Sequence, residues 1–196
     1  VMSVSSQARF ERMDRELMRG LPFQRVVIDY TASTPGARLA DFLQRGATWV
    51  ARRVCSELEF ETAQTLGPAR ALLRFARRFP ADLTIVHTEI PIWAAQHLIK
   101  DGRRVAVDVE DWYSEDLLFA DRQSRPLRML RHAEQAALRQ AAYSSATAQS
   151  MADALTNAYQ CPPPIVLRNS FPLQPRSRVD FPATTGTPRF IWFSQT

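Results

Sequence analysis

Polar side chains follow three short apolar stretches of the sequence, at the points where each stretch ends. These side chains are His87 and Glu89 after the first stretch, Glu110 and Asp111 after the second, and Asn169 after the third. A carboxylate beside a reacting carbon can stabilise positive charge on that carbon and orient an attacking hydroxyl group. The three stretches therefore mark candidate positions for ligand binding or chemistry.

Each of these residues also has a structural explanation. Glu110 and Asp111 suit the N-terminus of a helix, where the helix dipole favours negative charge. Asp108 lies inside its stretch, so a cap or a buried hydrogen bond is the expected role for that residue. His87 can be a structural histidine, and Asn169 can fix the turn that follows it. The residue types alone leave both kinds of explanation open.

An alternation of short β-branched runs with longer helical stretches positions these residues. The expected strands are residues 23–30, 83–87, 104–109, 143–148 and 164–168, and the expected helices are residues 5–19, 37–58, 69–79, 91–100, 126–142 and 149–159. Strands separated by helices of this length form βαβ units. We therefore predict an α/β fold, with a Rossmann-like parallel sheet and helices on both faces. The run at 83–87 is continuously apolar, which predicts a strand buried on both faces.

The C-terminal ends of parallel strands lie along one edge of a sheet, where ligands bind. We therefore expect His87, Glu110 and Asn169 to share that edge.

The two ends of the sequence predict a piece of a larger protein. The chain opens directly into the helix at 5–19, so we expect the first strand of the sheet to be missing. At the other end, residues 189–193 predict the first strand of a second domain. We assign residues 1–184 to one Rossmann-like domain, and residues 185–196 to a linker and that strand.

Several segments, taken in order, resemble motifs of one enzyme family. ADLTIVH at 81–87 resembles a strand that ends at an interdomain cleft, and VAVDVEDW at 105–112 resembles a strand reading roughly hydrophobic-hydrophobic-Tyr-Asp-x-His-Glu. IVLRNSFP at 165–172 resembles the turn before an interdomain linker, and RFIWFSQT at 189–196 resembles the first strand of a second domain. The family is that of the family-4-type retaining glycosyltransferases, which have the GT-B fold. The resemblance is close over about residues 80–196 and loose over 1–79, and Glu110 stands where relatives often have histidine.

The resemblance implies transfer of a hexose from a nucleotide sugar to a glycan or lipid-linked acceptor, with retention of configuration. It implies that this chain is the acceptor-binding half of the GT-B fold, with Glu110 and Asp111 as catalytic residues. His87, Glu89 and Asn169 would then bind substrate. The nucleotide sugar would be bound mainly by the second domain, so we expect this chain to hold no cofactor and to be inactive alone.

The formal net charge of +5 and the pI of about 9.9 come mostly from arginine, since Lys100 is the single lysine. Arg38, Arg45 and Arg52 recur every seven residues and form a stripe on one helix, with Trp49 between the last two. Such a face can rest on an anionic membrane surface, or it can be a solvated basic face. Nucleic acid is a less expected partner, because no RNA-binding aromatic signature accompanies the arginines.

Several common motifs are absent from the sequence. It has no GxGxxG, Walker loop, GxSxG or HExxH. It also lacks a DxD and a Cys/His cluster, so we predict no metal site. Cys55 and Cys161 lie far apart and are expected to be reduced and partly buried. With no apolar run of about 18 residues and no signal peptide, we expect a cytoplasmic protein that can contact the inner face of the membrane peripherally.

Two other functions fit the same sequence. One is a non-catalytic α/β module that binds an anionic partner, such as a membrane surface or a nucleic acid, through the arginine stripe. The other is a different enzyme of GT-B shape, such as a sugar-nucleotide epimerase.

Overall fold

The computed structural model describes residues 2–5, 8–23, 25–30, 34–58, 61–116, 118 and 125–170, and their strands form two sheets. The smaller sheet pairs β1 (Met2–Ser5) with β2 (Val26–Asp29). The larger sheet has the order β3-β4-β5-β6, with strands Thr84–Val86, Val105–Val109, Tyr143–Ala146 and Ile165–Val166. Neighbouring strands are parallel in both sheets, so the predicted α/β, Rossmann-like fold is confirmed.

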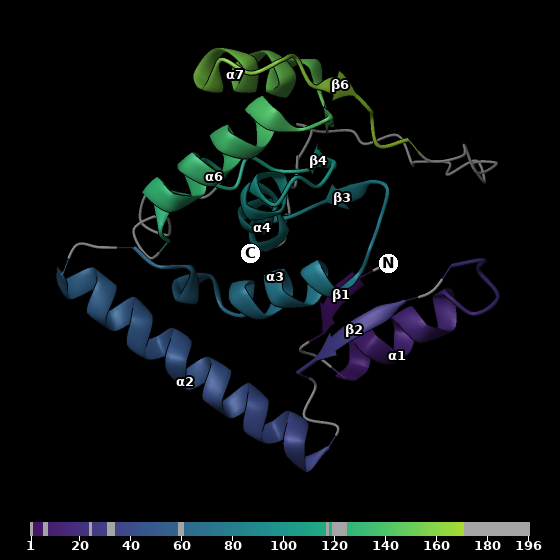
Figure 1. Cartoon of the computed structure of the whole chain (residues 1–196), viewed down its shortest axis with the longest axis vertical. Helices are drawn as coiled ribbons and strands as arrows, with labels where there is room; N and C mark the ends of the chain where they lie inside the picture. The colour runs from purple at the N-terminus through teal and green to yellow at the C-terminus, as the bar shows by residue number, and fades with distance from the viewer. Residues whose placement is uncertain are drawn as a thin grey trace, which may run out of the picture.

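Three helices connect the strands of the larger sheet (Figure 1). They are α4 (Glu89–Lys100), α6 (Leu127–Gln140) and α7 (Gln149–Tyr159). Because the strand order is sequential and such crossovers are right-handed, the three helices lie on one face of the sheet. Val86, Val107 and Val109 point into this layer, where they share a core with Leu130 and Leu155.

The opposite face of the larger sheet carries Ile85, Tyr143 and Ile165, which are all exposed among the described residues. The prediction that the strand at 83–87 is buried on both faces is therefore wrong. β3 is the first strand in the sheet order and has one neighbour, β4, so Ile85 is covered less than a central residue would be.

The first 80 residues contain both strands of the smaller sheet and most of the remaining helices. These helices are α1 (Ala8–Leu17), α2 (Pro35–Leu58), the 3₁₀ helix η1 (Ala63–Leu66) and α3 (Ala69–Arg78). The helix predicted at residues 5–19 is present as α1 (Ala8–Leu17), whereas the expectation that no strand comes before it is wrong. Met2–Ser5 forms β1, which pairs with β2. This pairing joins segments that are distant in the sequence, so the local spacing of apolar residues does not reveal it.

The predicted helices at 37–58, 69–79, 126–142 and 149–159 are confirmed within a few residues. Cys55 and Cys161 are buried and free, as expected. No helix among the described residues is long and apolar enough to cross a membrane. The strand predicted at 189–193 and the linker before it lie outside the described residues, so the domain boundary stays a prediction.

Candidate functional site

The C-terminal edge of the larger sheet brings together polar residues that are distant in the sequence. His87 directly follows β3, and Glu110 directly follows β4. β3 and β4 pair with Val86 opposite Val107, so the next residues along the two strands, His87 and Asp108, stand side by side. The register of one strand pair therefore creates this part of the candidate site.

The carboxylate of Asp108 is held from both neighbouring strands. Ser145 in β5 donates its Oγ hydrogen to Asp108 Oδ1 at 2.5 Å. On the other side, His87 Nδ1 lies 2.9 Å from Asp108 Oδ2. The hydrogen bond from Ser145 is the structural role expected for Asp108, and it fixes the carboxylate that faces His87.

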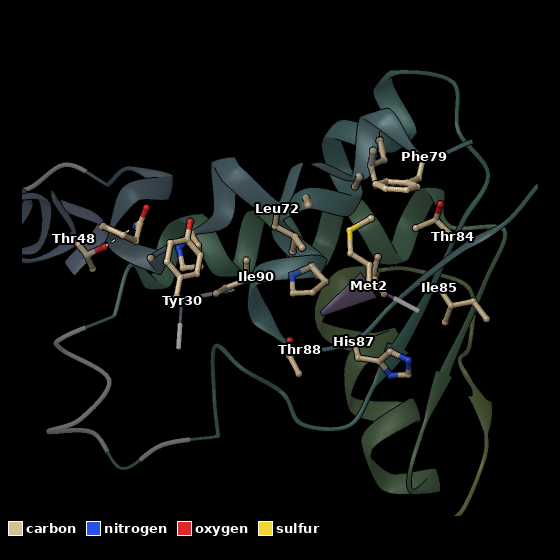
Figure 2. A pocket seen from close by; sticks show the side chains of 18 of the residues that line it. Met2, Tyr30, Thr48, Leu72, Phe79, Thr84, Ile85, His87, Thr88 and Ile90 are labelled. Atoms are coloured by element: carbon tan, nitrogen blue, oxygen red, sulfur yellow. Dashed lines mark hydrogen bonds between the residues drawn. The ribbon is translucent and has the colours of Figure 1, made fainter. Parts of the chain in front are cut away.

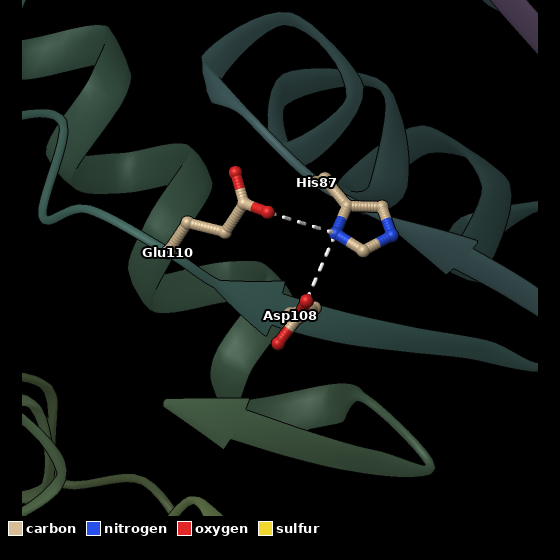
Figure 3. Close-up of side chains that lie close together, drawn as sticks. All are labelled: His87, Asp108 and Glu110. Atoms are coloured by element: carbon tan, nitrogen blue, oxygen red, sulfur yellow. Dashed lines mark ion pairs between the residues drawn. The ribbon is translucent and has the colours of Figure 1, made fainter. Parts of the chain in front are cut away.

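Glu110 adds a second carboxylate to the same side of the imidazole. Its Oε1 lies 4.0 Å from His87 Nδ1, so two acidic groups face that nitrogen. The ring Nε2 points away from both carboxylates (Figure 3). The side chains of His87 and Glu110 are about half exposed, and a ligand can therefore reach the imidazole Nε2 and the Glu110 carboxylate.

The same three residues form a possible donor set for a cation. One atom each from His87, Asp108 and Glu110 lies within 4.8 Å of the others. An imidazole with two carboxylates suits divalent transition metals. The sequence predicted no metal site, and spacing alone gives no signal for this cluster because pairing of β3 with β4 creates it. The contact between His87 Nδ1 and the Asp108 carboxylate accounts for this geometry without a cation.

Two helices anchor the turn that follows Glu110. Glu134 of α6 accepts hydrogen bonds from the Ser114 backbone N–H at 3.1 Å and from Ser114 Oγ at 2.7 Å. Tyr159 of α7 also donates to Glu134, and Trp112 Nε1 donates to the Tyr159 hydroxyl at 2.9 Å. Burial raises the pKa of Glu134, although these hydrogen bonds oppose the shift. The network ties the turn that follows Glu110 to α6 and α7.

Arg125 ties this turn to the start of α4. Its Nη1 donates to the Tyr113 carbonyl at 2.8 Å and to Asp116 Oδ1 at 3.1 Å, and it lies 3.7 Å from Glu89 Oε2. Glu89, a predicted substrate-binding residue, thus takes part in an ion pair next to the turn. Neither Arg125 nor Ser145 was singled out from the sequence, since their partners are set by tertiary packing.

The carboxylates around Tyr113 create a region of negative charge. Burial raises the pKa of Tyr113 to about 12, and the charges of Asp111 and Glu110 add to this shift. Asp111, a predicted catalytic residue, is exposed in the bend after Glu110. It lies close enough to Tyr113 to affect its ionisation, and no contact between Asp111 and His87 supports a shared role.

Thr88, between His87 and Glu89, has an unusual backbone conformation. Its φ of 63° and ψ of 166° lie in a region that is almost restricted to glycine. Strain of this kind costs about 1–3 kcal/mol and persists where the surrounding structure imposes it. The threonine residue type gave no signal of this conformation in the sequence.

A cavity of about 1230 Å³ lies beside His87. It extends from His87 and Thr88 to Arg45, Trp49 and Arg52 of α2, and most of its lining side chains are apolar. Figure 2 shows His87 and Thr88 in this lining, together with Leu72 of α3 and Ile90 of α4. The polar edge of the sheet therefore borders a space suited to an apolar group.

Asn169 lies at the same edge but away from the His87 cluster. It is three residues beyond β6, and the backbone N–H of Leu167 continues the pairing with β5 through Ala146 O at 2.9 Å. β6 is three strands from β3, a separation of roughly 14 Å. Asn169 lies at the predicted edge of the sheet. Only an elongated ligand could contact both Asn169 and His87.

Comparison with known proteins identifies no relative. No protein-family model matches the chain, and neither a curated protein nor a solved structure matches it. The resemblance to glycosyltransferases therefore depends on the sequence segments quoted above, and the fold class comes from the sheet topology.

Proposed function

We propose that this chain is the acceptor-binding half of a glycosyltransferase that moves a hexose from a nucleotide sugar to an acceptor hydroxyl. The proposal draws on the sequence resemblance and on one structural observation. His87, Asp108 and Glu110 cluster at the C-terminal edge of a Rossmann-like parallel sheet, where such folds bind ligands, beside a largely apolar cavity.

The chemistry of glycosyl transfer gives each side chain a role. The bond between the sugar carbon and the diphosphate breaks, so positive charge develops on that carbon while the acceptor oxygen forms the new bond. The carboxylate of Glu110 would stabilise this positive charge and would also accept a hydrogen bond from the acceptor sugar, which orients its hydroxyl group. His87 Nε2 would accept a hydrogen bond from the acceptor hydroxyl and take its proton as the new bond forms, while Asp108 holds the other side of the ring.

The cavity favours a lipid-linked acceptor over a free glycan. Side chains such as Leu72, Phe79, Leu83 and Leu98 line it, and burial of a hydrocarbon chain against them is favourable. The acceptor sugar would then lie near His87, with its lipid along the cavity.

The proposal is tested by measuring the affinity of this chain for a fluorescent prenyl-diphosphate-linked hexose in detergent micelles. We expect His87→Ala and Glu110→Gln to weaken binding about tenfold each, because each removes a group that bonds to the sugar. His132→Ala, at an exposed histidine on α6, is the matched control and should bind normally. Equal affinity of all three variants and the unmodified chain would contradict the proposal.

A non-catalytic module for an anionic partner is the second candidate, because Arg38 and Arg45 are exposed on α2. In that case Arg38→Gln would weaken binding of the partner, whereas His87→Ala and Glu110→Gln would have no effect on any ligand.

A further inference from the structure

Helix α2 presents its apolar side to solvent. At 100° per residue, its large apolar side chains from Leu39 to Val54 fall on one broad face, and all of these are exposed. Phe42 is 72% exposed, Trp49 70%, and Leu39 and Leu43 59% each. Val50 and Val54 continue the same face and are exposed as well. A surface helix of a globular protein usually directs its apolar face toward the core. In α2 the apolar face is directed toward solvent instead.

The inward side of α2 carries small and polar residues instead. Cys55 is buried there, and Gln44 and Thr48 are half-buried and hydrogen-bonded to each other at 3.1 Å. The helix packs chiefly against η1, where Arg52 Nε donates to the Thr65 carbonyl at 3.1 Å. These contacts on the inward side fix the orientation of α2. The apolar face, on the opposite side of the helix, is therefore directed outward.

Arginines border the exposed apolar face. Arg38, Arg45 and Arg52 form a row along one side of α2, and Trp49 lies between that row and the apolar residues. Arg45 is exposed and pairs with Asp41 at 2.9 Å, so part of its charge is offset. An aromatic ring at the boundary between basic and apolar residues is typical of helices that lie in a lipid interface.

The whole net charge of the chain belongs to the part that contains this helix. Residues 1–80 have thirteen arginines and eight acidic residues, whereas residues 81–196 have twelve basic and twelve acidic residues. Figure 1 shows α2 at the end of the molecule opposite α7. The excess of positive charge and the exposed apolar face of α2 therefore lie in the same part of the chain.

We propose that α2 docks on the surface of a bilayer that contains anionic phospholipids. Phe42, Leu39 and Leu43 would enter the boundary between headgroups and acyl chains, and the arginine row would contact lipid phosphates. A nucleic acid would match the arginines but would leave the apolar face in water. A second copy of the chain would match the apolar face but would bring two arginine rows together.

Docking through α2 also places the membrane next to the cavity described above, since Arg45, Trp49 and Arg52 line both. A lipid-linked acceptor could then pass from the bilayer toward His87. This consequence depends on the proposed function, whereas the docking of α2 does not.

The test is co-sedimentation of the chain with vesicles of phosphatidylcholine, with and without phosphatidylglycerol, at low and high salt. We expect binding to the anionic vesicles that weakens at high salt, and much weaker binding to neutral vesicles. The measurement requires no sugar donor or acceptor, so its failure is distinct from failure of the proposed function.

Matched variants assign the binding to α2. Arg38→Gln should reduce the partition coefficient about fivefold, whereas Arg168→Gln, beyond β6, should not change it. The double variant Leu39→Ser/Leu43→Ser should reduce it roughly tenfold or more. Ile165→Ser/Leu167→Ser is the control, because these residues are 55% and 58% exposed near β6. Circular dichroism of each variant checks that the fold is retained.

Three results would overturn the proposal. One is equal sedimentation with neutral and anionic vesicles, and a second is an equal loss of binding in the control variants. The third is self-association of the unmodified chain in gel filtration that Leu39→Ser/Leu43→Ser abolishes, which would make this face a contact between copies.

Discussion

Thr88 separates the two polar residues that follow β3, and its backbone is strained. The residue has a φ of 63°, a value that a β-branched side chain rarely adopts. Its carbonyl accepts the Ile92 N–H at 3.1 Å, so the first turn of α4 begins directly from this conformation. The strain therefore fixes how His87 leaves the strand and how Glu89 enters the helix.

Replacement of Thr88 by glycine should relieve this strain. We expect Thr88→Gly to raise the free energy of unfolding by about 0.5–2 kcal/mol, the strain energy less the entropy cost of glycine. The matched control is Thr62→Gly, because Thr62 has an ordinary extended φ of −138° and should lose stability instead. Urea unfolding of both variants measures the difference, and equal destabilisation would show that Thr88 is not strained.

The candidate residues could be named from the sequence, but their contacts could not. His87, Glu110 and Asn169 were found because each follows an apolar run, and all three lie at the predicted edge. The contact of His87 with Asp108 depends on the register that pairs Val86 with Val107, which neither strand specifies alone. Glu89 pairs with Arg125, whose position depends on packing around the turn after β4.

Helices α6 and α7 hold the turn after β4 through one buried carboxylate. Glu134 accepts three hydrogen bonds, from the Ser114 backbone, the Ser114 hydroxyl and the Tyr159 hydroxyl. Loss of the carboxylate oxygens would leave these donors unpaired in the interior, which costs about 1–3 kcal/mol for each buried group. The position of the turn that follows Glu110 thus depends on contacts with two helices, α6 and α7.

This network makes stability depend on pH. Burial raises the pKa of Glu134 above its ordinary value of 4.5, so between pH 4.5 and the raised pKa the folded chain holds a proton that the unfolded chain has released. The stabilisation is complete below pH 4.5 and is lost as the pH rises through the raised pKa. A glutamine does not titrate, so the stability of Glu134→Gln lacks this dependence on pH. As the pH rises from acid to neutral, the free energy of unfolding of the unmodified chain should therefore fall relative to that of the variant. Urea unfolding across that range checks this, and a constant difference would contradict it.

Long helices were the most predictable elements, because their apolar spacing extends over several turns. The helix predicted at 149–159 has these same bounds in the structure. β1 was missed because it has four residues and its pairing with β2 is not visible in the local pattern. The exposure of Ile85 was missed because a continuous apolar run does not distinguish an edge strand from a central one.

The whole molecule combines a packed α/β core with a basic N-terminal part. The core is centred on the larger sheet and on α4, α6 and α7, whereas the first 80 residues carry all of the net charge and the exposed face of α2. The cavity joins the two parts, since α2 lines one end and His87 the other. Under the proposed function, an acceptor would pass through this cavity from α2 to the polar edge of the sheet.

The most direct test of this account is to map the acceptor on the isotopically labelled chain by NMR. On addition of the prenyl-diphosphate-linked hexose, the largest amide shifts should occur at His87, Thr88 and Glu110, at the C-terminal edge of the sheet. Smaller shifts should follow the cavity toward Trp49. Shifts confined to the opposite edge, around Arg104 and Ala142, would contradict the account, because the ligand would then bind where β4 and β5 begin.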